Sequence, residues 1–222
     1  MMKSRILRRL FLLSLVTASL PAWAGGLIDE LSSAQKEVVK SGKQLVITEE
    51  IEGKPWPKIK IYQLVAATPE EVAAVFVDYD NAKSYTPNLL KSEVVQKISG
   101  KVKDIDYGVD IPILPDEYYT ARNTLSCPEK GTYRVDWKLL RAVQTKDSVG
   151  CIRIEPYDDQ SVICYQNLVT PGSSMAGLLR GKAISQMRDA VSALVAMVEK
   201  QKKANPAALE KQIVNLRADL TN

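Results

Sequence analysis

The stretch VAATPEEVAAVFVDYDN, residues 65–81, describes the passage of the chain from a β-strand into a helix. Thr68 is a good N-cap residue, Pro69 suits the first helical position, and Glu71 stands three residues after the cap. This spacing is typical of a capping box, in which the two side chains bond each other's backbone N–H groups. The apolar residues that follow predict a helix that runs to about Tyr79.

Strand patterns lie on both sides of this stretch. Two β-rich segments precede it, at 43–52 and 59–65, with a Gly- and Pro-containing turn between them. A second short helix is predicted at 80–88, where Pro87 stops it. Further strands are predicted near 90–99, 102–111, 117–127, 131–141, 147–155 and 161–169. Short, turn-forming loops separate these six strands, which favours an antiparallel meander.

A long helix follows the strands. From Met175 to Val198, apolar residues recur every three or four positions, and Asn205-Pro206 ends the pattern near Lys203. Such a helix is roughly 45 Å long. Residues 207–220 predict a short, exposed terminal helix whose charged character is typical of a solvated face, and a contact surface for a partner is the alternative.

The first 24 residues have the three parts of a secretory signal peptide. Basic residues precede a short apolar run from Leu10 to Leu20, and small residues stand at Ala22 and Ala24. The apolar run is shorter than the roughly 20 residues that a membrane-spanning helix needs. We therefore expect cleavage after Ala24 and a periplasmic or secreted location. Residues 27–41 predict a short amphipathic helix ahead of the first strand.

Cleavage also removes the positive charge of the chain. The 222 residues include 30 basic and 26 acidic ones, and four of the basic residues lie in the leader, which leaves 26 of each. A neutral protein has no general attraction to nucleic acid or to anionic membranes, so no nucleic-acid partner is expected. The 198 remaining residues suit one domain with a sizeable core.

The chain contains no histidine. This excludes Ser-His-Asp and Cys-His catalysis and imidazole metal ligands. The three cysteines lack the spacing of a zinc or redox site, and the common phosphate- and dinucleotide-binding motifs are absent from the sequence. We predict no cofactor and no metal.

The three cysteines are Cys127, Cys151 and Cys164. A hairpin centred between Tyr157 and Asp158 would place Cys151 and Cys164 directly opposite each other, where a cross-strand disulfide is allowed. A slip of one residue in the turn would abolish it. Three buried thiols are the alternative, and the connectivity stays open.

The order of elements predicts an α+β architecture in which a strongly curved antiparallel sheet wraps around the long C-terminal helix. The concave apolar face of such a sheet must be covered. One helix is narrower than the sheet, so a gap is expected between them, and gaps of this kind are usually ligand cavities.

The sequence resembles a known superfamily at this point. Residues 65–81, the Pro-containing segment at 82–88 and the strand from Ser92 are similar to the entry of START-like, polyketide cyclase/dehydrase-type domains, the SRPBCC or helix-grip superfamily. The last strand pair and the long helix after Pro171-Gly172 fit the same pattern. The resemblance covers about residues 43–203, with 25–42 as an N-terminal helix and 204–222 as a tail helix. It implies two short helices after the first strands and a hydrophobic cavity under the long helix.

Residues that line this cavity can be proposed from strand periodicity. On 131–141, Tyr133 and Trp137 share the face opposite Arg134 and Asp136, so they should point inward. Plain core packing is the alternative for all such positions. The full candidate set is Tyr79, Tyr107, Tyr119, Tyr133, Trp137, Ile152, Ile154, Tyr165, Met175 and Leu179. The resemblance further implies that Asp78, Tyr79 and Tyr85 edge the mouth.

Three functions remain open from the sequence. The first is binding or transport of a small apolar ligand such as a lipid, sterol, quinone or polyketide, by a monomer. The second is a cyclase- or dehydrase-type enzyme with acid–base groups among Asp110, Glu117, Tyr119, Arg122, Asp136 and Arg141, most of which we expect on solvated strand faces. The third is a scaffold protein without a ligand. Trp56, between two prolines, is interpreted as a turn residue, with transient membrane contact as the alternative.

Overall fold

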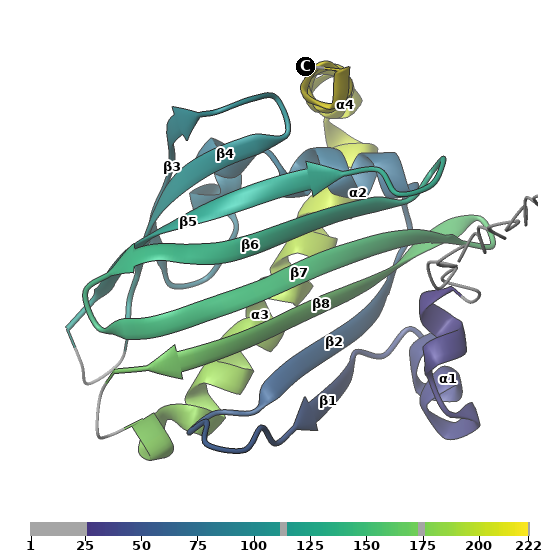
Figure 1. Cartoon of the computed structure of the whole chain (residues 1–222). Helices are drawn as coiled ribbons and strands as arrows, with labels where there is room; N and C mark the ends of the chain where they lie inside the picture. The colour runs from purple at the N-terminus through teal and green to yellow at the C-terminus, as the bar shows by residue number, and fades with distance from the viewer. Residues whose placement is uncertain (1–25, 112–114, 173–175, 222) are drawn as a thin grey trace, which may run out of the picture.

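The structure, a computed structural model, describes residues 26–111, 115–172 and 176–221, and its centre is a curved sheet of eight antiparallel strands (Figure 1). The strand order is β1-β2-β8-β7-β6-β5-β4-β3, so six consecutive strands form a meander and the first hairpin pairs with the last strand. The strands are β1 (Leu45–Glu49), β2 (Lys58–Val65), β3 (Leu89–Lys97), β4 (Val102–Val109), β5 (Glu117–Ser126), β6 (Tyr133–Ala142), β7 (Thr145–Tyr157) and β8 (Gln160–Pro171). The predicted α+β class and meander are confirmed.

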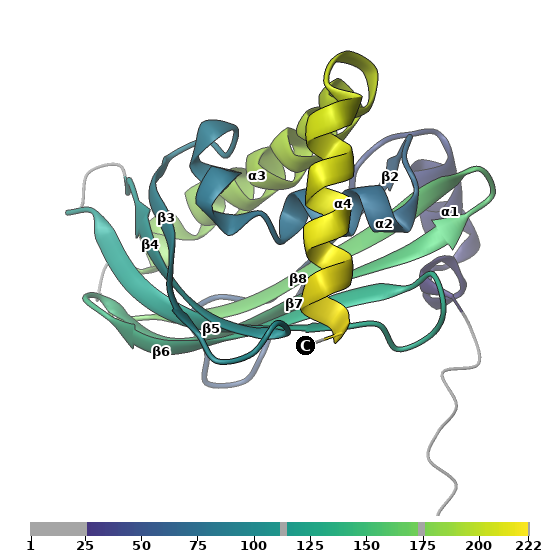
Figure 2. The same ribbon diagram turned by 90° about the horizontal axis from the view of Figure 1, so that it is seen from above.

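The helices lie mainly on the concave face of the sheet, which Figure 2 shows from above. The connection from β2 to β3 contains α2 (Pro69–Phe76) and the 3-10 helix η2 (Tyr79–Ser84), and α3 (Ala176–Ala204) crosses the sheet behind them. The predicted capping box of α2 is present, because Thr68 Oγ1 accepts from Glu71 N at 3.3 Å and Glu71 Oε2 accepts from Thr68 N at 2.7 Å. α3 has 29 residues, which corresponds to roughly 43 Å.

Both faces of the sheet are covered at its β1–β2–β8 side. On the concave face, Ile61 and Ile163 belong to the main core together with Val191 and Val198 of α3. On the convex face, the neighbouring residue Tyr62 belongs to a second, smaller core with Leu27, Leu31, Val39, Val162 and Cys164. Successive side chains along β2 and β8 therefore point alternately into two separate hydrophobic layers, one on each face of the sheet.

The N-terminal segment differs from the single predicted helix. A 3-10 helix, η1 (Leu27–Glu30), is followed by α1 (Ser33–Lys40), and Ser32 between them caps α1 by accepting from Gln35 N. Glu30 ties η1 to the sheet, since Arg153 donates to both of its carboxylate oxygens and Tyr62 donates at 3.1 Å. The predicted signal peptide lies outside the described residues. Within the described ranges, no helix has the length and apolar character needed to cross a membrane.

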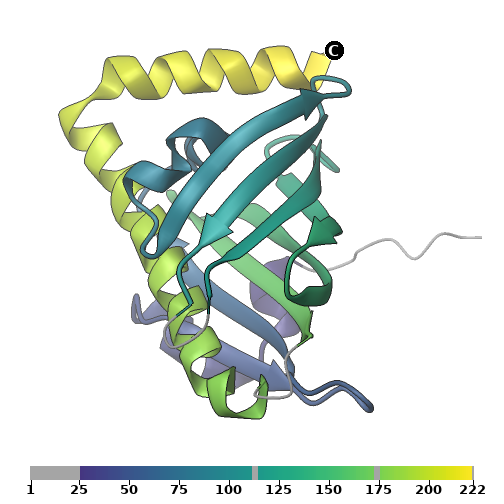
Figure 3. The same cartoon turned by 90° about the vertical axis from the view of Figure 1, so that its left-hand side faces the viewer.

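The last helix, α4 (Pro206–Thr221), is not the exposed tail that the sequence predicts. Leu209, Ile213 and Leu216 are buried and join the main core. Figure 3 shows α4 folding back from α3 across the end of the sheet, with its C-terminus at the turn between β3 and β4. The charged residues misled the interpretation, because they form specific bonds: Arg217 donates to both oxygens of Glu70, each at 2.7 Å.

The β7–β8 hairpin differs by one residue from the centre that a disulfide requires. Tyr157 pairs with Gln160, so the turn is centred between Asp158 and Asp159. Cys164 therefore faces Arg153, and Cys151 faces Gln166. The cysteines share one face as diagonal neighbours, and all three thiols are free.

Candidate ligand cavity

A cavity of about 360 Å³ lies between the concave face of the sheet, η2 and the N-terminal two-thirds of α3. Side chains from β4 to β8 form its floor, and α3 covers it with residues from Leu179 to Leu194. Phe76 of α2 and Trp56 of the β1–β2 loop contribute to its walls. Its volume falls within the roughly 300–1,000 Å³ of pockets that hold drug-sized ligands.

Aromatic side chains dominate the walls. Of the 14 aromatic residues in the chain, eight line the cavity: Trp56, Phe76, Tyr79, Tyr85, Tyr107, Tyr119, Trp137 and Tyr165. Some of these rings pack against one another, with centroids 5.0 Å apart for Trp137 and Tyr165 and 5.1 Å apart for Tyr107 and Tyr119. Contacts at this distance hold the rings in fixed orientations.

The tyrosine hydroxyls of the cavity stay protonated. Burial raises the pKa of Tyr119 to about 12, and it raises the pKa values of Tyr79, Tyr107 and Tyr165 further. Removal from water disfavours the phenolate, so at neutral pH each group is an uncharged donor and acceptor. The aromatic wall therefore offers hydrogen bonds without charge.

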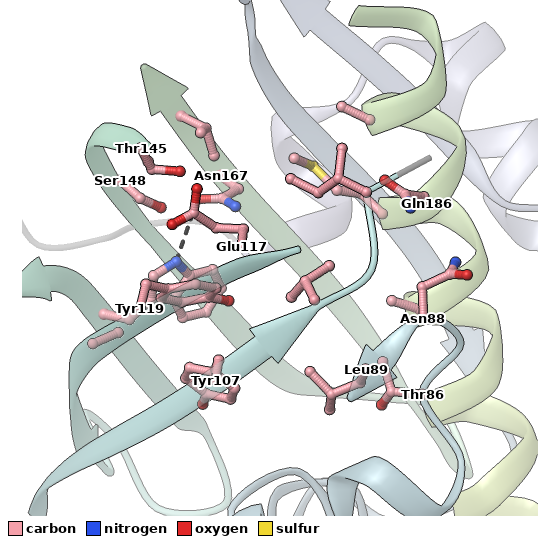
Figure 4. A pocket seen from close by; sticks show the side chains of 18 of the residues that line it. Thr86, Asn88, Leu89, Tyr107, Glu117, Tyr119, Thr145, Ser148, Asn167 and Gln186 are labelled. Carbon is pink, nitrogen blue, oxygen red and sulfur yellow. Dashed lines mark hydrogen bonds between the residues drawn. The ribbon is translucent and has the colours of Figure 1, made fainter. Parts of the chain in front are cut away.

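Polar side chains gather at one end of the cavity, where Glu117, Thr145, Ser148 and Asn167 lie close together (Figure 4). Glu117 is 4 % exposed and accepts from the backbone N–H groups of Val143 and Gln144 at 2.9–3.1 Å. Its carboxylate thus holds the β6–β7 turn in place. On the α3 side, Gln186 donates to the carbonyl oxygen of Asp110 at 3.3 Å.

Comparison with known proteins gives one clear result. No protein-family model and no curated protein sequence matches the chain. A solved STAR-related lipid transfer protein from Xanthomonas axonopodis matches with a TM-score of 0.63, at 16% identity, over 70% of this chain and 93% of that one. The chain has a START-like fold. Human STARD10 (TM-score 0.58, 17% identity, 74% of each chain) and the Zhui aromatase/cyclase from Streptomyces sp. R1128 (TM-score 0.54, 18% identity, 66% of this chain and 96% of that one) share it.

The START-like fold brings six of the ten proposed cavity residues to the cavity wall. These are Tyr79, Tyr107, Tyr119, Trp137, Tyr165 and Leu179. Tyr85, which was placed at the mouth, and Ile111 also line the cavity. Asp78 does not: it accepts a hydrogen bond from Gln212 of α4 instead. Met175 lies outside the described residues.

Three proposed residues belong to the solid core and not to the cavity wall. Tyr133, Ile152 and Ile154 do point to the concave face, as predicted, and are at most 8 % exposed. They lie at the other end of the sheet, where α2 and α4 cover it. Strand alternation gives the face of a side chain, whereas its distance along the strand from the covering helices decides whether space remains beside it.

Two polar residues of the cavity, Asn123 and Asn167, are not among those proposed from the sequence. Asn123 stands between Ala121 and Leu125 on the inward face of β5, and Asn167 stands between Tyr165 and Val169 on that of β8. On each strand, the amide stands where the nearest inward neighbours are apolar or aromatic. A polar residue at such a position is a signal that the period-two pattern itself could have supplied.

Most of the acid–base candidates lie away from the START-like cavity. Arg122 pairs with Asp104, Asp136 pairs with Arg134, and Arg141 donates to Thr120, all on the convex face. Asp110 is exposed. Glu117 and Tyr119 do line the cavity, but the Glu117 carboxylate is already bonded to two backbone N–H groups.

Proposed function

We propose that the protein binds a small apolar, lipid-like molecule in this cavity and acts outside the cytoplasm after cleavage near Ala24. The observation that carries the proposal is a cavity of about 360 Å³ with eight aromatic side chains in its walls. Burial of apolar ligand surface there is favourable by roughly 25 cal/mol per Å², before the costs of binding are subtracted.

The fold supports this proposal. Solved structures with the same fold include proteins that are named for lipid transfer. A carrier suits export, because an apolar molecule that crosses an aqueous compartment needs shielding from water. The neutral charge of the chain after leader removal agrees with a ligand that is recognised by shape and not by charge.

Lys182 lines the cavity and is exposed to solvent, so we infer that the cavity opens beside it. Trp56 also lines the cavity. We propose that a monomer contacts a membrane transiently at this side when it exchanges ligand. A cyclase-type reaction has less support, because Glu117 is the single carboxylate among the described wall residues and it is occupied by backbone donors.

Native mass spectrometry of the protein isolated from its own compartment, followed by organic extraction, tests the proposal. We expect a co-purifying apolar molecule, or, for the emptied protein, saturable uptake of the neutral fluorescent probe N-phenylnaphthylamine. A protein that is empty on isolation and takes up neither this probe nor any lipid, sterol or quinone would contradict it and favour a ligandless scaffold. The N-terminal residue in the same spectrum tests cleavage: Gly25 is expected, and an intact Met1 contradicts it.

A further inference from the structure

Three residues from neighbouring strands form a row across the cavity floor. Trp137 of β6 pairs with Gly150 of β7, and Gly150 pairs with Asn167 of β8. A Cβ atom at position 150 would lie 2.5 Å from Cζ2 of Trp137, so the indole passes over the glycine. Its Nε1–H reaches Asn167 two strands away and donates to Oδ1 at 3.3 Å.

This hydrogen bond fixes the orientation of the Asn167 amide. The indole nitrogen can only donate, so it must meet the oxygen of Asn167 and not its nitrogen. The Nδ2 group is left to the cavity, and it has no hydrogen-bond partner in the described part of the chain. Asn167 is only 8 % exposed. A ligand that fills the cavity displaces water from this donor, and a donor left without a partner is unfavourable, so the site favours a ligand that brings an acceptor.

Charge at the site favours a neutral ligand. Among the described residues of the cavity wall, only Glu117 and Lys182 are charged. Lys182 is exposed to solvent. Glu117 lies at the Asn167 end of the cavity (Figure 4). A phosphate or carboxylate beside Asn167 would be buried near a carboxylate without a cation to balance it, which is strongly unfavourable.

We propose that Asn167 is the polar anchor for a carbonyl oxygen of a neutral, ring-bearing ligand of the quinone or aromatic ketone class. The inference rests on the proposed function and gives the ligand its chemistry. The Nδ2 group donates to the carbonyl oxygen, and Ser148, which lies beside Asn167, adds a second hydroxyl donor. Trp137 and Tyr165, with ring centroids 5.0 Å apart, supply flat surfaces for the ligand ring.

A matched pair of ligands tests the anchor. Dimethylnaphthoquinone with both methyl groups on the quinone ring cannot add thiols, and dimethylnaphthalene has the same rings without the carbonyl oxygens. Each would be titrated against bound N-phenylnaphthylamine, together with palmitate as a charged chain ligand. For the wild-type protein we expect the quinone to bind about tenfold or more tightly than the hydrocarbon, as one hydrogen bond to a buried donor allows, and palmitate to bind more weakly than the quinone.

Two variants separate the donor from the packing. Asn167→Leu removes the amide but keeps a side chain of similar size, and Asn167→Ala removes both the amide and most of the side chain. Both should abolish the preference for the quinone, and the leucine variant should retain the hydrocarbon. Gln166→Leu is the control, because Gln166 precedes Asn167 but faces Cys151 on the convex side.

The possible outcomes test the role of Asn167 separately from the proposal that the cavity binds an apolar ligand. Equal affinity of quinone and hydrocarbon for the wild-type protein, or an unchanged preference in both Asn167 variants, would overturn the anchor while the cavity stands. Tighter binding of palmitate than of the quinone would overturn the neutral ligand class. Absence of binding by every probe, N-phenylnaphthylamine included, would overturn the proposed function itself.

Discussion

A Cβ atom on Gly100 would lie 2.3 Å from the carbonyl oxygen of Asp219, so the turn between β3 and β4 meets α4 where only glycine fits. Lys97 and Lys103, on either side of this turn, both donate to the Asp219 carboxylate, which gives the contact a charged component. The last helix of the chain is thus bound at its far end as well as along its length.

Gly100→Ala should destabilise the protein by about 1–3 kcal/mol, the usual cost of a group inserted into packed surroundings. The contact is with backbone atoms, which cannot turn aside as a side chain can. Urea unfolding followed by circular dichroism measures the change. Gly181→Ala is the control, because Gly181 lies within α3 and a Cβ there meets nothing within 4 Å. It should raise stability by about 0.5–1 kcal/mol through helix propensity, and equal effects of the two substitutions would refute the close contact.

Leu216→Ala tests whether α4 belongs to the folded core. Leu216 is fully buried, and truncation of a buried leucine costs about 2–5 kcal/mol. Val214, on the same helix, is 53 % exposed, so Val214→Ala should change stability by less than about 0.5 kcal/mol. Thermal unfolding of both variants gives the comparison. An exposed tail helix predicts instead that neither variant differs from the wild-type protein.

The sequence predicts the order of elements well because each depends on local patterns. The capping box at Thr68 and Glu71 forms as the spacing indicates, and every predicted strand is present within a few residues. The errors concern relations between distant segments. Helix α4 has a mixed surface, and only its position against α2 shows that Arg217 meets Glu70 and that Leu216 is covered.

The cavity shows the same division between local and distant information. Alternation predicts correctly that Trp137 and Ile152 face the concave side. The same alternation would be seen if the concave side were filled by a solid core, so it does not predict a cavity. Trp137 borders open space and Ile152 does not, because α2 and α4 cover only one end of the sheet. The hydrogen bond between Trp137 and Asn167 joins residues that lie two strands and 30 sequence positions apart. The periodicity of either strand does not predict it.

The thiol groups provide a test of the β7–β8 register. Cys127 is exposed, while Cys151 and Cys164 are buried, and burial raises the pKa of both. Ellman's reagent should therefore react quickly with one thiol of the native protein and with three after denaturation. The single fast thiol should vanish in Cys127→Ser. Detection of only one thiol in the denatured wild-type protein would show that Cys151 and Cys164 are bridged.

Acid should weaken the fold through Asp104 on the convex face. Arg122 donates to its two oxygens at 2.8 and 2.9 Å, and this pairing holds the pKa of Asp104 below its ordinary value of 3.8. A carboxylate with a lowered folded-state pKa stabilises the protein above the unfolded-state value, and the contribution is lost as the pH falls through the folded-state value. Asp104→Asn should thus be less stable than the wild-type protein at neutral pH.

The difference between Asp104→Asn and the wild-type protein should shrink as the pH falls below about 4, near the unfolded-state pKa. Unfolding free energies measured from pH 7 to pH 3 give the curve. Asp116→Asn serves as the control, because Asp116 is exposed and has no ion pair within the described ranges. A constant difference over the whole range would mean that the Arg122 pairing does not respond to protonation of Asp104.

Filling the cavity from α3 should abolish ligand binding without loss of the fold. Ala183 lines the cavity and is 9 % exposed, so the ring of Ala183→Phe would occupy space that a ligand needs. Substitutions that fill cavities commonly maintain or raise stability, by about 0.5–2 kcal/mol. We expect N-phenylnaphthylamine affinity to fall at least about tenfold, as a loss of about 1.4 kcal/mol implies. Ser185 is exposed on α3 and does not line the cavity, so Ser185→Phe should bind the probe like the wild-type protein. Unchanged probe binding by a folded Ala183→Phe would place the ligand outside this cavity, because the ring and the probe cannot share the space between α3 and the sheet.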